Sequence, residues 1–284
     1  MTDTNTDAMT DTNADTSAHR YTGPAGALRC GAADSAAVAG RYLRHYLRQP
    51  QLLVFSTVQP VMFVLLFRYV FGGAISTAAL PSADYVSFLL PGILVQATTF
   101  GATNTAVGLA EDLRTGVMDR FRSLPMSRVA VLAGRTLSDL IRNTFVVLLM
   151  TGVGYLVGFR FQNGPAAAAG TIAVVVTFSY SLSWIYAVVG LAAKGAETAQ
   201  AIGFVVTFPI VFASSVFVPI ETFPGWLQGF ARLSPITKVA DASRGLALGD
   251  PLPVAEPVLW TMAWVGAILV IFVPLAIWRF RRGE

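Results

Sequence analysis

Apolar residues fill long segments of the chain, and short polar stretches separate these segments. Six of the segments could cross a bilayer as helices, because a transmembrane helix needs about 20 mostly apolar residues. The pattern therefore predicts an all-α membrane protein with six transmembrane helices. The spans are predicted at residues 52–71, 85–109, 138–159, 166–193, 199–218 and 258–278.

The third predicted span is the most polar of the six. Asp139, Arg142 and Asn143 lie in its first turn, so we expect these side chains near one end of the span. No acidic residue is then expected near the bilayer midplane, where ion-coupled carriers usually need one. Gly154 and Gly158 form a G-x-x-x-G pair in this span. That spacing permits close helix packing, although it also recurs by chance in Gly-rich spans.

Two different patterns precede the first span. Residues 1–35 are rich in Thr, Asp, Asn and Ala, a composition that buries too little apolar surface to fold, and we predict a disordered cytosolic tail. Residues 38–49 instead have the pattern of an amphipathic helix that ends before Pro50. A basic amphipathic helix before a span is typical of the cytoplasmic membrane surface. Its apolar face comprises Val38, Tyr42, Leu43, Tyr46 and Leu47.

The most highly charged stretch runs from Glu111 to Arg142, into the start of the third span. Lys and Arg are enriched in cytoplasmic loops, so the part before the span is predicted to be cytoplasmic. Most of the chain's 20 Lys and Arg residues fall on that same side, together with both chain ends. Both termini are therefore predicted to be cytoplasmic.

Within this loop, Gly116–Leu124 has the pattern of a short amphipathic helix. Pro125 interrupts the pattern, and Ser127 could cap a second helix that enters the third span. The short helix could dock in a groove of another protein, or the segment could be a solvated loop that only sets topology. The pattern alone favours neither the docking helix nor the solvated loop. The apolar face comprises Val117, Phe121 and Leu124, and the polar face comprises Asp119, Arg120 and Arg122.

The longest external segment is Pro219–Pro257, between the fifth and sixth spans. It predicts two short amphipathic helices, one with Trp226, Leu227 and Phe230 on one face and one from Pro235 to near Gly249. These helices could dip back into the outer leaflet, and their apolar content argues against an ordinary extracellular loop.

Composition agrees with a membrane protein. The chain of 284 residues is 54% hydrophobic and 13% charged, whereas soluble domains carry about 25% charged residues. Its net charge of +4 is too small, and too clearly placed in loops, to indicate nucleic-acid binding.

The residues that common enzymes require are missing from the sequence. There is no G-x-x-x-x-G-K-[ST] motif, so the chain does not bind ATP through a P-loop. His19 and His45 both precede the first span, so no histidine is placed to activate a Ser or Cys, and no His, Glu and Asp cluster could hold a metal. We expect no catalytic residues, no metal and no cofactor in this chain. Energy for transport would come from another chain.

Three blocks resemble the type-2 ABC exporter permeases. GVMDRFRSLPMSR (Gly116–Arg128) resembles the family's signature loop, and Arg114 and Val117 depart from it as in the daunorubicin/doxorubicin-resistance subgroup. Arg48–Gly73 and Phe217–Gly249 also resemble that subgroup. The positions that match the signature are Asp112, Gly116, Asp119, Pro125, Ser127 and Arg128.

The resemblance implies a transmembrane domain over residues 36–284. It implies a permease that pairs with a second copy or a paralogue, and with two ATPase subunits that bind ATP and Mg. Its function would be ATP-driven export of an apolar or amphipathic drug or lipid-like product across the plasma membrane. The alternatives are an ion-coupled carrier and a non-pumping membrane scaffold or immunity protein. Coupling to the ATPase is expected at Asp112, Gly116, Val117, Asp119, Arg120, Phe121, Leu124, Pro125, Ser127 and Arg128.

Six residues in the first, second and fifth spans could line a substrate path. Taken singly, each is more simply explained as a lipid-facing or packing side chain, since spans are apolar throughout. The candidates are Phe63, Phe67, Phe100, Asn104, Phe208 and Phe212.

Overall fold

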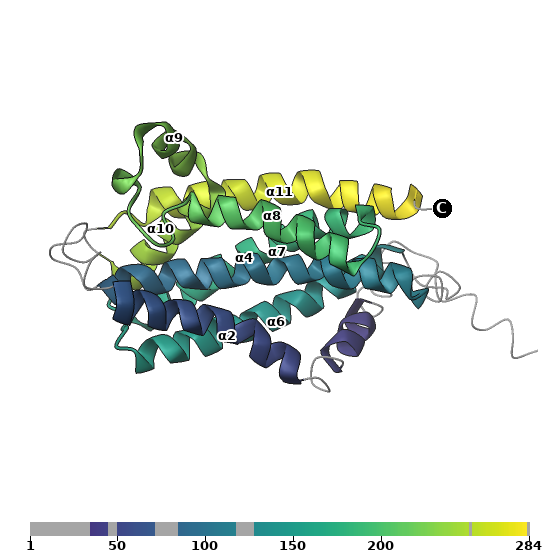
Figure 1. The fold of residues 1–284 in the computed structure, drawn as a ribbon, viewed down its shortest axis with the longest axis horizontal. Helices are drawn as coiled ribbons and strands as arrows, with labels where there is room; N and C mark the ends of the chain where they lie inside the picture. The colour runs from purple at the N-terminus through teal and green to yellow at the C-terminus, as the bar shows by residue number, and fades with distance from the viewer. Residues whose placement is uncertain (1–34, 45–49, 72–84, 118–127, 250–251, 283–284) are drawn as a thin grey trace, which may run out of the picture.

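The computed structural model describes residues 35–44, 50–71, 85–117, 128–249 and 252–282, and it contains helices and turns but no strand within these ranges. The long helices run side by side along the long axis of the molecule (Figure 1). A helix at residues 35–44 comes first. The elements that follow are α2 (Pro50–Leu66), the π-helical turn η2 (Phe67–Phe71), α4 (Tyr85–Arg114), α6 (Arg128–Leu156), α7 (Gly164–Ala192), α8 (Ala196–Phe212), the 3-10 turn η3 (Ile220–Thr222), α9 (Gly225–Leu233), α10 (Pro235–Leu248) and α11 (Ala255–Arg282).

Four of these helices, α4, α6, α7 and α11, are long and apolar enough to cross a membrane. Two shorter apolar helices accompany them, one at Thr57–Val70 and the other α8. The all-helical class that the hydropathy pattern predicts is therefore confirmed in the described part of the chain, and these elements lie where the six spans are predicted.

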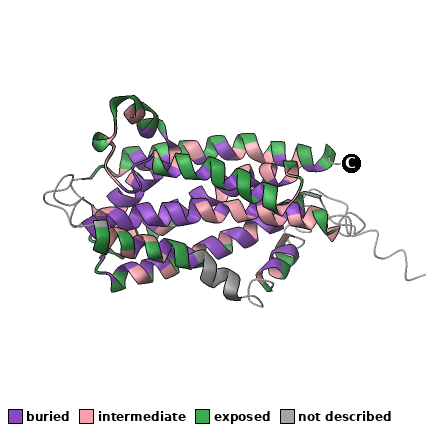
Figure 2. Ribbon diagram, in the orientation of Figure 1, coloured by how far each residue is buried: buried purple, intermediate pink, exposed green. Residues whose placement is uncertain are grey.

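The helix α4 lies at the centre of the bundle. It packs against α2, α6, α7, α8 and α10, and most of its span is buried, whereas α11 is largely exposed (Figure 2). Glycine allows a direct backbone contact with α7, because a Cβ atom on Gly190 of α7 would lie 2.6 Å from the carbonyl oxygen of Ala106 in α4. The backbones of α4 and α7 thus touch directly.

The third predicted span differs most from the structure. The helix α6 begins at Arg128, well before the predicted start, so Asp139 and Arg142 lie near the middle of the helix rather than in its first turn. They continue the helix because other helices supply their partners. The helix also ends earlier than predicted, at Leu156, and Gly158 follows with a φ of 105° that favours glycine.

The G-x-x-x-G pair has only one packing glycine. A Cβ on Gly154 would collide with the side chain of Leu90 in α4, so this position does allow a close approach. Gly158 lies beyond the end of α6 and serves the turn instead.

The helix before the first span begins earlier than predicted, and residues 45–49 of the predicted range lie outside the described residues. Pro50 is the first residue of α2, a position where proline is favoured because its missing N–H has no partner there in any case. The fifth predicted span is shorter than expected, since α8 ends at Phe212.

The helices α9 and α10 have different surroundings. Trp226 and Phe230 of α9 are exposed, whereas α10 is largely buried against α4, α7 and α11. Buried Arg244 of α10 holds the segment after α8 by donating to the carbonyl oxygens of Ser215 (2.6 Å) and Val216 (3.0 Å) and, on α4, to that of Phe88 (2.9 Å).

Candidate functional site

Seven phenylalanines from α2, η2, α4, α8 and the turn after α8 form a continuous aromatic row. Along α8 the ring centroids of Phe204 and Phe208 are 5.4 Å apart, and those of Phe208 and Phe212 are 4.3 Å apart. Phe100 of α4 joins one end, at 6.1 Å from Phe204. The aromatic row comprises Phe63, Phe67, Phe100, Phe204, Phe208, Phe212 and Phe217.

The other end of the row is a compact cluster around Phe217. Its ring centroid lies 4.8 Å from that of Phe67, 4.9 Å from that of Phe212 and 5.6 Å from that of Phe63. All five phenylalanines that the sequence predicts for the substrate path therefore lie in one row.

Phe204 and Phe217 are not among the path residues predicted from the sequence. A signal existed for Phe204, because Phe204, Phe208 and Phe212 are spaced four apart, and residues four apart lie on one face of a helix. No such signal exists for Phe217, which follows the end of α8.

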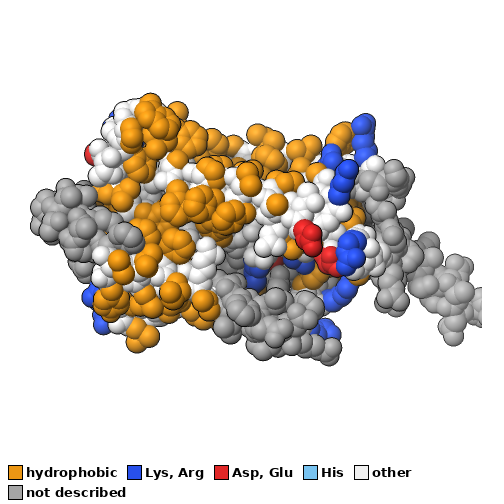
Figure 3. All heavy atoms as spheres, in the orientation of Figure 1, with side chains coloured by type: hydrophobic (Ala, Val, Ile, Leu, Met, Phe, Trp, Pro, Cys, Tyr) orange, Lys and Arg blue, Asp and Glu red, His pale blue; other side chains and the backbone are white. Residues whose placement is uncertain are grey.

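The α8 part of the row lies at the surface of the single chain, whereas Phe217 is buried. Phe204 is 53% exposed, and the neighbouring side chains of α2, Val58 and Met62, are also exposed. Figure 3 shows hydrophobic side chains gathered over α2 and α8 on this face. A large apolar surface of this kind is covered by lipid, by a ligand or by another protein.

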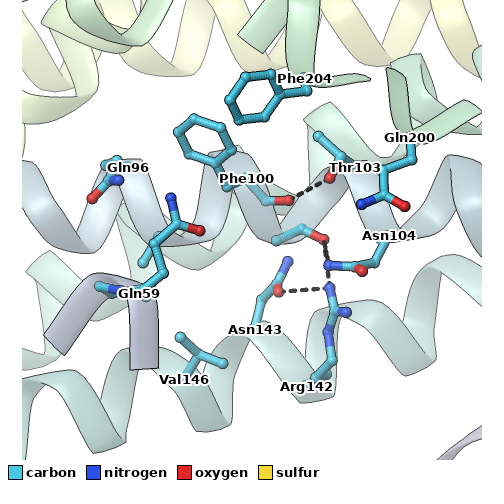
Figure 4. Close-up of a pocket in the computed structure, with 13 residues that line it drawn as sticks. Gln59, Gln96, Phe100, Thr103, Asn104, Arg142, Asn143, Val146, Gln200 and Phe204 are labelled. Atoms are coloured by element: carbon cyan, nitrogen blue, oxygen red, sulfur yellow. Dashed lines mark hydrogen bonds between the residues drawn. The ribbon is translucent and has the colours of Figure 1, made fainter. Parts of the chain in front are cut away.

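A cavity of about 180 Å³ lies beside Phe100 and Phe204, between α2, α4, α6 and α8 (Figure 4). Most of its other wall residues carry hydrogen-bonding side chains, which is unusual among apolar helices. Asn104, the remaining residue predicted for the substrate path, is one of these polar wall residues. The polar wall residues are Gln59, Gln96, Thr103, Asn104, Arg142, Asn143 and Gln200.

Hydrogen bonds fix the α6 side of the cavity. Arg142 donates to the carbonyl oxygen of Gly101 (2.5 Å) and to Asn143 Oδ1 (3.1 Å), and Asn143 Nδ2 donates to Ser179 Oγ (2.6 Å). Gly101 makes room for this arrangement, because a Cβ there would lie 2.6 Å from Asn143 Oδ1. Arg142 and Asn143 are therefore held in place before any ligand arrives.

A buried charged cluster lies behind the cavity. Asp139 is fully buried, with its carboxylate 3.4 Å from Arg135 Nε and 3.9 Å from an Arg142 Nη atom. Thr105 of α4 donates a hydrogen bond of 2.6 Å to Asp139 Oδ2. Two guanidinium groups and a hydroxyl thus compensate a carboxylate that would otherwise be very unfavourable in this environment.

The cluster extends to the helix at residues 35–44. Tyr42 donates a hydrogen bond of 2.5 Å to Asp112 near the end of α4, and Arg135 lies over the Tyr42 ring, 4.7 Å from its centroid, and 3.9 Å from Asp112. Burial, reinforced by the charge of Asp112, raises the pKa of Tyr42, so its hydroxyl keeps the proton that it donates. A connected set of polar groups therefore runs from the first helix to the cavity.

The structure describes only the borders of the predicted coupling segment. Asp112 lies in α4, Gly116 follows that helix with a φ of 69° that favours glycine, Val117 is the next residue, and Arg128 is the first residue of α6. The remaining predicted positions, and with them the coupling helix, lie outside the described residues. They are Asp119, Arg120, Phe121, Leu124, Pro125 and Ser127.

A second cavity, of about 250 Å³, lies on the side of α8 that faces α7 and α11. Its walls are almost entirely apolar and include Phe178, Ile202 and Trp264. Of the wall residues that the structure describes, Tyr186 alone has an ionisable side chain, and it shares a hydrogen bond with Thr207. The helix α8 therefore has a polar cavity on one side and an apolar cavity on the other.

Residues 35–248 match the family model described as ABC-2 type transporter. The daunorubicin resistance ABC transporter permease protein DrrB1 of Streptomyces coeruleorubidus is 35% identical over 238 residues, which are 82% of this chain and 80% of that protein. The probable doxorubicin resistance ABC transporter permease protein DrrC of Mycobacterium tuberculosis is 29% identical over 272 residues, covering 93% and 94%. The putative transport permease ycf38 of Pyropia yezoensis is 24% identical over 235 residues, covering 81% and 80%.

Proposed function

Because the chain belongs to the ABC-2 type transporter family, we propose that it is the permease subunit of an ATP-driven exporter. The exported molecule would be an apolar or amphipathic drug or lipid-like product, moved outward across the plasma membrane. The observation that carries this proposal is the aromatic row that ends at a polar cavity, because such a surface suits a molecule with an apolar body and a polar group.

A second copy of the chain, or a paralogous permease, would close this path. Gln59 of α2 and Gln200 of α8 line the cavity and are both exposed in the single chain. A carboxamide that faces hydrocarbon loses its hydrogen bonds with water, so this face suits a water-accessible path between two copies better than lipid. Symmetric pairing of the same face is the commonest way in which oligomers assemble.

We also propose six spans with both termini in the cytoplasm. In this arrangement α2 with η2, α4, α6, α7, α8 and α11 cross the membrane, and α9 and α10 form the external re-entrant segment. The topology is tested by thiol labelling of single-cysteine variants in a Cys30→Ser background. A cysteine replacing Gly116 is expected to react only from the cytoplasm, and one replacing Gln228 only from outside. Reaction of both from one side would contradict this topology.

The partner ATPase would bind between α4 and α6, at the segment Gly116–Arg128, with one ATPase for each permease copy. Both borders of this segment lie near the buried charged cluster, since Asp112 belongs to α4 and Arg135 to α6. A movement that the ATPase imposes on the segment would thus reach the cavity wall through directly contacting side chains. ATP and Mg would be bound by the ATPase.

Reconstituted transport tests the function. The permease, alone or with its ATPase, is placed in liposomes, and uptake of the uncharged amphipathic dye Nile red into inside-out vesicles is followed. We expect uptake that requires both chains and ATP. Uptake that persists without ATP and is abolished by a proton uncoupler would indicate an ion-coupled carrier, and binding of the dye without uptake would indicate a scaffold.

A further inference from the structure

We propose that the cavity at the Phe100 end of the aromatic row binds an uncharged hydrogen-bonding head group, such as a hydroxyl, a carboxamide or a sugar ring, and discriminates against an ammonium group. This inference rests on the proposed function in taking the row as the path of an exported molecule. It adds the chemical class of the head group and the residues that select it.

Gln96 is the first observation that indicates a ligand. Its side chain, on α4, is 1% exposed and lines the cavity, and its Oε1 atom has no hydrogen-bond partner (Figure 4). Buried polar atoms are nearly always hydrogen-bonded, since leaving one without a partner destabilises the protein. Gln96 lies in the wall of a cavity more than ten times larger than one water needs, so a small rotation of its carboxamide would bring Oε1 to a ligand group.

The walls match a group that both donates and accepts hydrogen bonds. Gln59, Gln96, Asn104 and Gln200 each present a carboxamide, which carries an acceptor oxygen and a donor nitrogen. Asn104 uses part of this capacity within α4, donating to the carbonyl oxygen of Gly101 at 3.1 Å. A hydroxyl, an amide or a sugar can pair with several such groups at once.

The charges of the cavity disfavour a cation. Among the described residues of its wall there is no Asp or Glu, and Arg142 is the one charged side chain. The carboxylate of Asp139 lies behind Arg142, is fully buried and is not part of the wall. Among these wall residues a bound ammonium would therefore meet a guanidinium and no carboxylate, and the like charge would weaken its binding.

The aromatic row would then hold the rest of the molecule. Phe100 and Phe204 belong both to the cavity wall and to the row, and their ring centroids are 6.1 Å apart. A head group in the cavity would leave the apolar body along Phe204, Phe208 and Phe212, where stacking and apolar contacts stabilise it.

The test uses two probes that share one fluorescent BODIPY-dodecyl body and carry either a glucoside or a trimethylammonium head. Binding to the permease–ATPase complex is measured in nanodiscs by fluorescence anisotropy and corrected for empty nanodiscs. ATP-dependent uptake is measured separately in proteoliposomes. The wild type is expected to bind the glucoside at least about tenfold more tightly than the ammonium probe, the ratio that one well-placed interaction provides.

Three variants change the head-group site. Gln96→Leu is expected to weaken glucoside binding about tenfold and to leave ammonium binding unchanged. Gln96→Glu is expected to raise affinity for the ammonium probe and to lower it for the glucoside. Because a buried Glu could prevent folding, Gln59→Glu, at an exposed position in the same wall, provides a second test with the same expected direction. Gln162→Glu, at an exposed position outside the cavity, is the control and should change neither affinity.

The outcomes separate the two proposals. Equal binding of both probes by the wild type, or Gln59→Glu and Gln96→Glu variants that keep the wild-type preference, would overturn the head-group inference. The expected preference without ATP-dependent uptake of either probe would uphold the binding site and overturn the exporter. An anionic probe of the same body that binds more tightly than the glucoside would show that Arg142 selects charge, and would also overturn the inference.

Discussion

Replacing Asp139 by Asn removes one carboxylate from the buried charged cluster while keeping the size of the side chain. Thr105 can still donate to the remaining oxygen, so the hydrogen bond of 2.6 Å need not be lost. Arg135 keeps Asp112 at 3.9 Å, but Arg142 loses the carboxylate that lies 3.9 Å away. The variant therefore tests the countercharge itself rather than packing.

The size of the effect follows from the distances. At an effective dielectric constant of about 20, unit charges at the 3.4 and 3.9 Å separations of this cluster attract by about 4–5 kcal/mol. Removing one partner of a buried ion pair typically destabilises a protein by about 3–5 kcal/mol, because an uncompensated charge stays buried. For a chain of this size we expect the unfolding temperature to fall by about 10 °C.

The assay is thermal unfolding of the purified complex, followed by the loss of its monodisperse peak in size-exclusion chromatography. Glu111→Gln is the matched control, because it breaks an ion pair of 2.7 Å with Arg114 at the exposed end of α4, where solvent screens the charges, and it should leave the unfolding temperature unchanged. The double variant Asp139→Asn/Arg142→Gln should recover part of the loss, since it removes the guanidinium that lost its countercharge. If Asp139→Asn unfolds at the same temperature as Glu111→Gln, the buried cluster does not have the role described here.

Three further variants test coupling, helix packing and the external anchor. Phe121→Ala, at the centre of the predicted coupling helix, should weaken ATPase binding by about 2 kcal/mol and reduce co-purification, whereas Arg122→Ala should not; equal retention of the ATPase by both would contradict the coupling helix. Gly190→Ala should lower the unfolding temperature, because the new Cβ would lie 2.6 Å from a backbone oxygen of α4 and overpacking costs about 1–3 kcal/mol. The control Gly152→Ala, with open space around it, should raise the unfolding temperature slightly. The opposite order of the two unfolding temperatures would refute the close contact. Arg244→Met should expose the segment after α8 to protease, because three backbone carbonyls lose their donor, and unchanged cleavage would show that Arg244 does not anchor it.

Hydropathy could predict the helices because burial in hydrocarbon and burial in protein both select apolar residues. The helices α7 and α11 lie close to the predicted fourth and sixth spans, and the helix predicted from Pro235 ends at Leu248 as α10, where Gly249 with a φ of 76° favours a helix end. Five phenylalanines of the aromatic row could also be predicted as path residues from their positions in apolar spans.

The partners of the buried charges could not be predicted. The pattern places Asp139 and Arg142 in the first turn of a span, and it does not show that Arg135 and Thr105 compensate the carboxylate of Asp139. Arg244 is a similar case, since its hydrogen bond to Phe88 joins residues separated by 156 positions. The polar cavity depends on four helices at once, and a pattern read along one helix does not show which side chains will meet.

The backbone contact between α4 and α7 at Gly190 distinguishes helices that stay fixed from a helix, α8, that can move. Two helices that touch backbone to backbone cannot slide past each other without separating, and α4 is further held by α2, α6 and α10. The helix α8, in contrast, lies between two cavities, so it can tilt into free space on either side. We therefore expect α8 to be the element whose tilt alternately widens the polar and the apolar cavity, while α4 and α7 stay fixed.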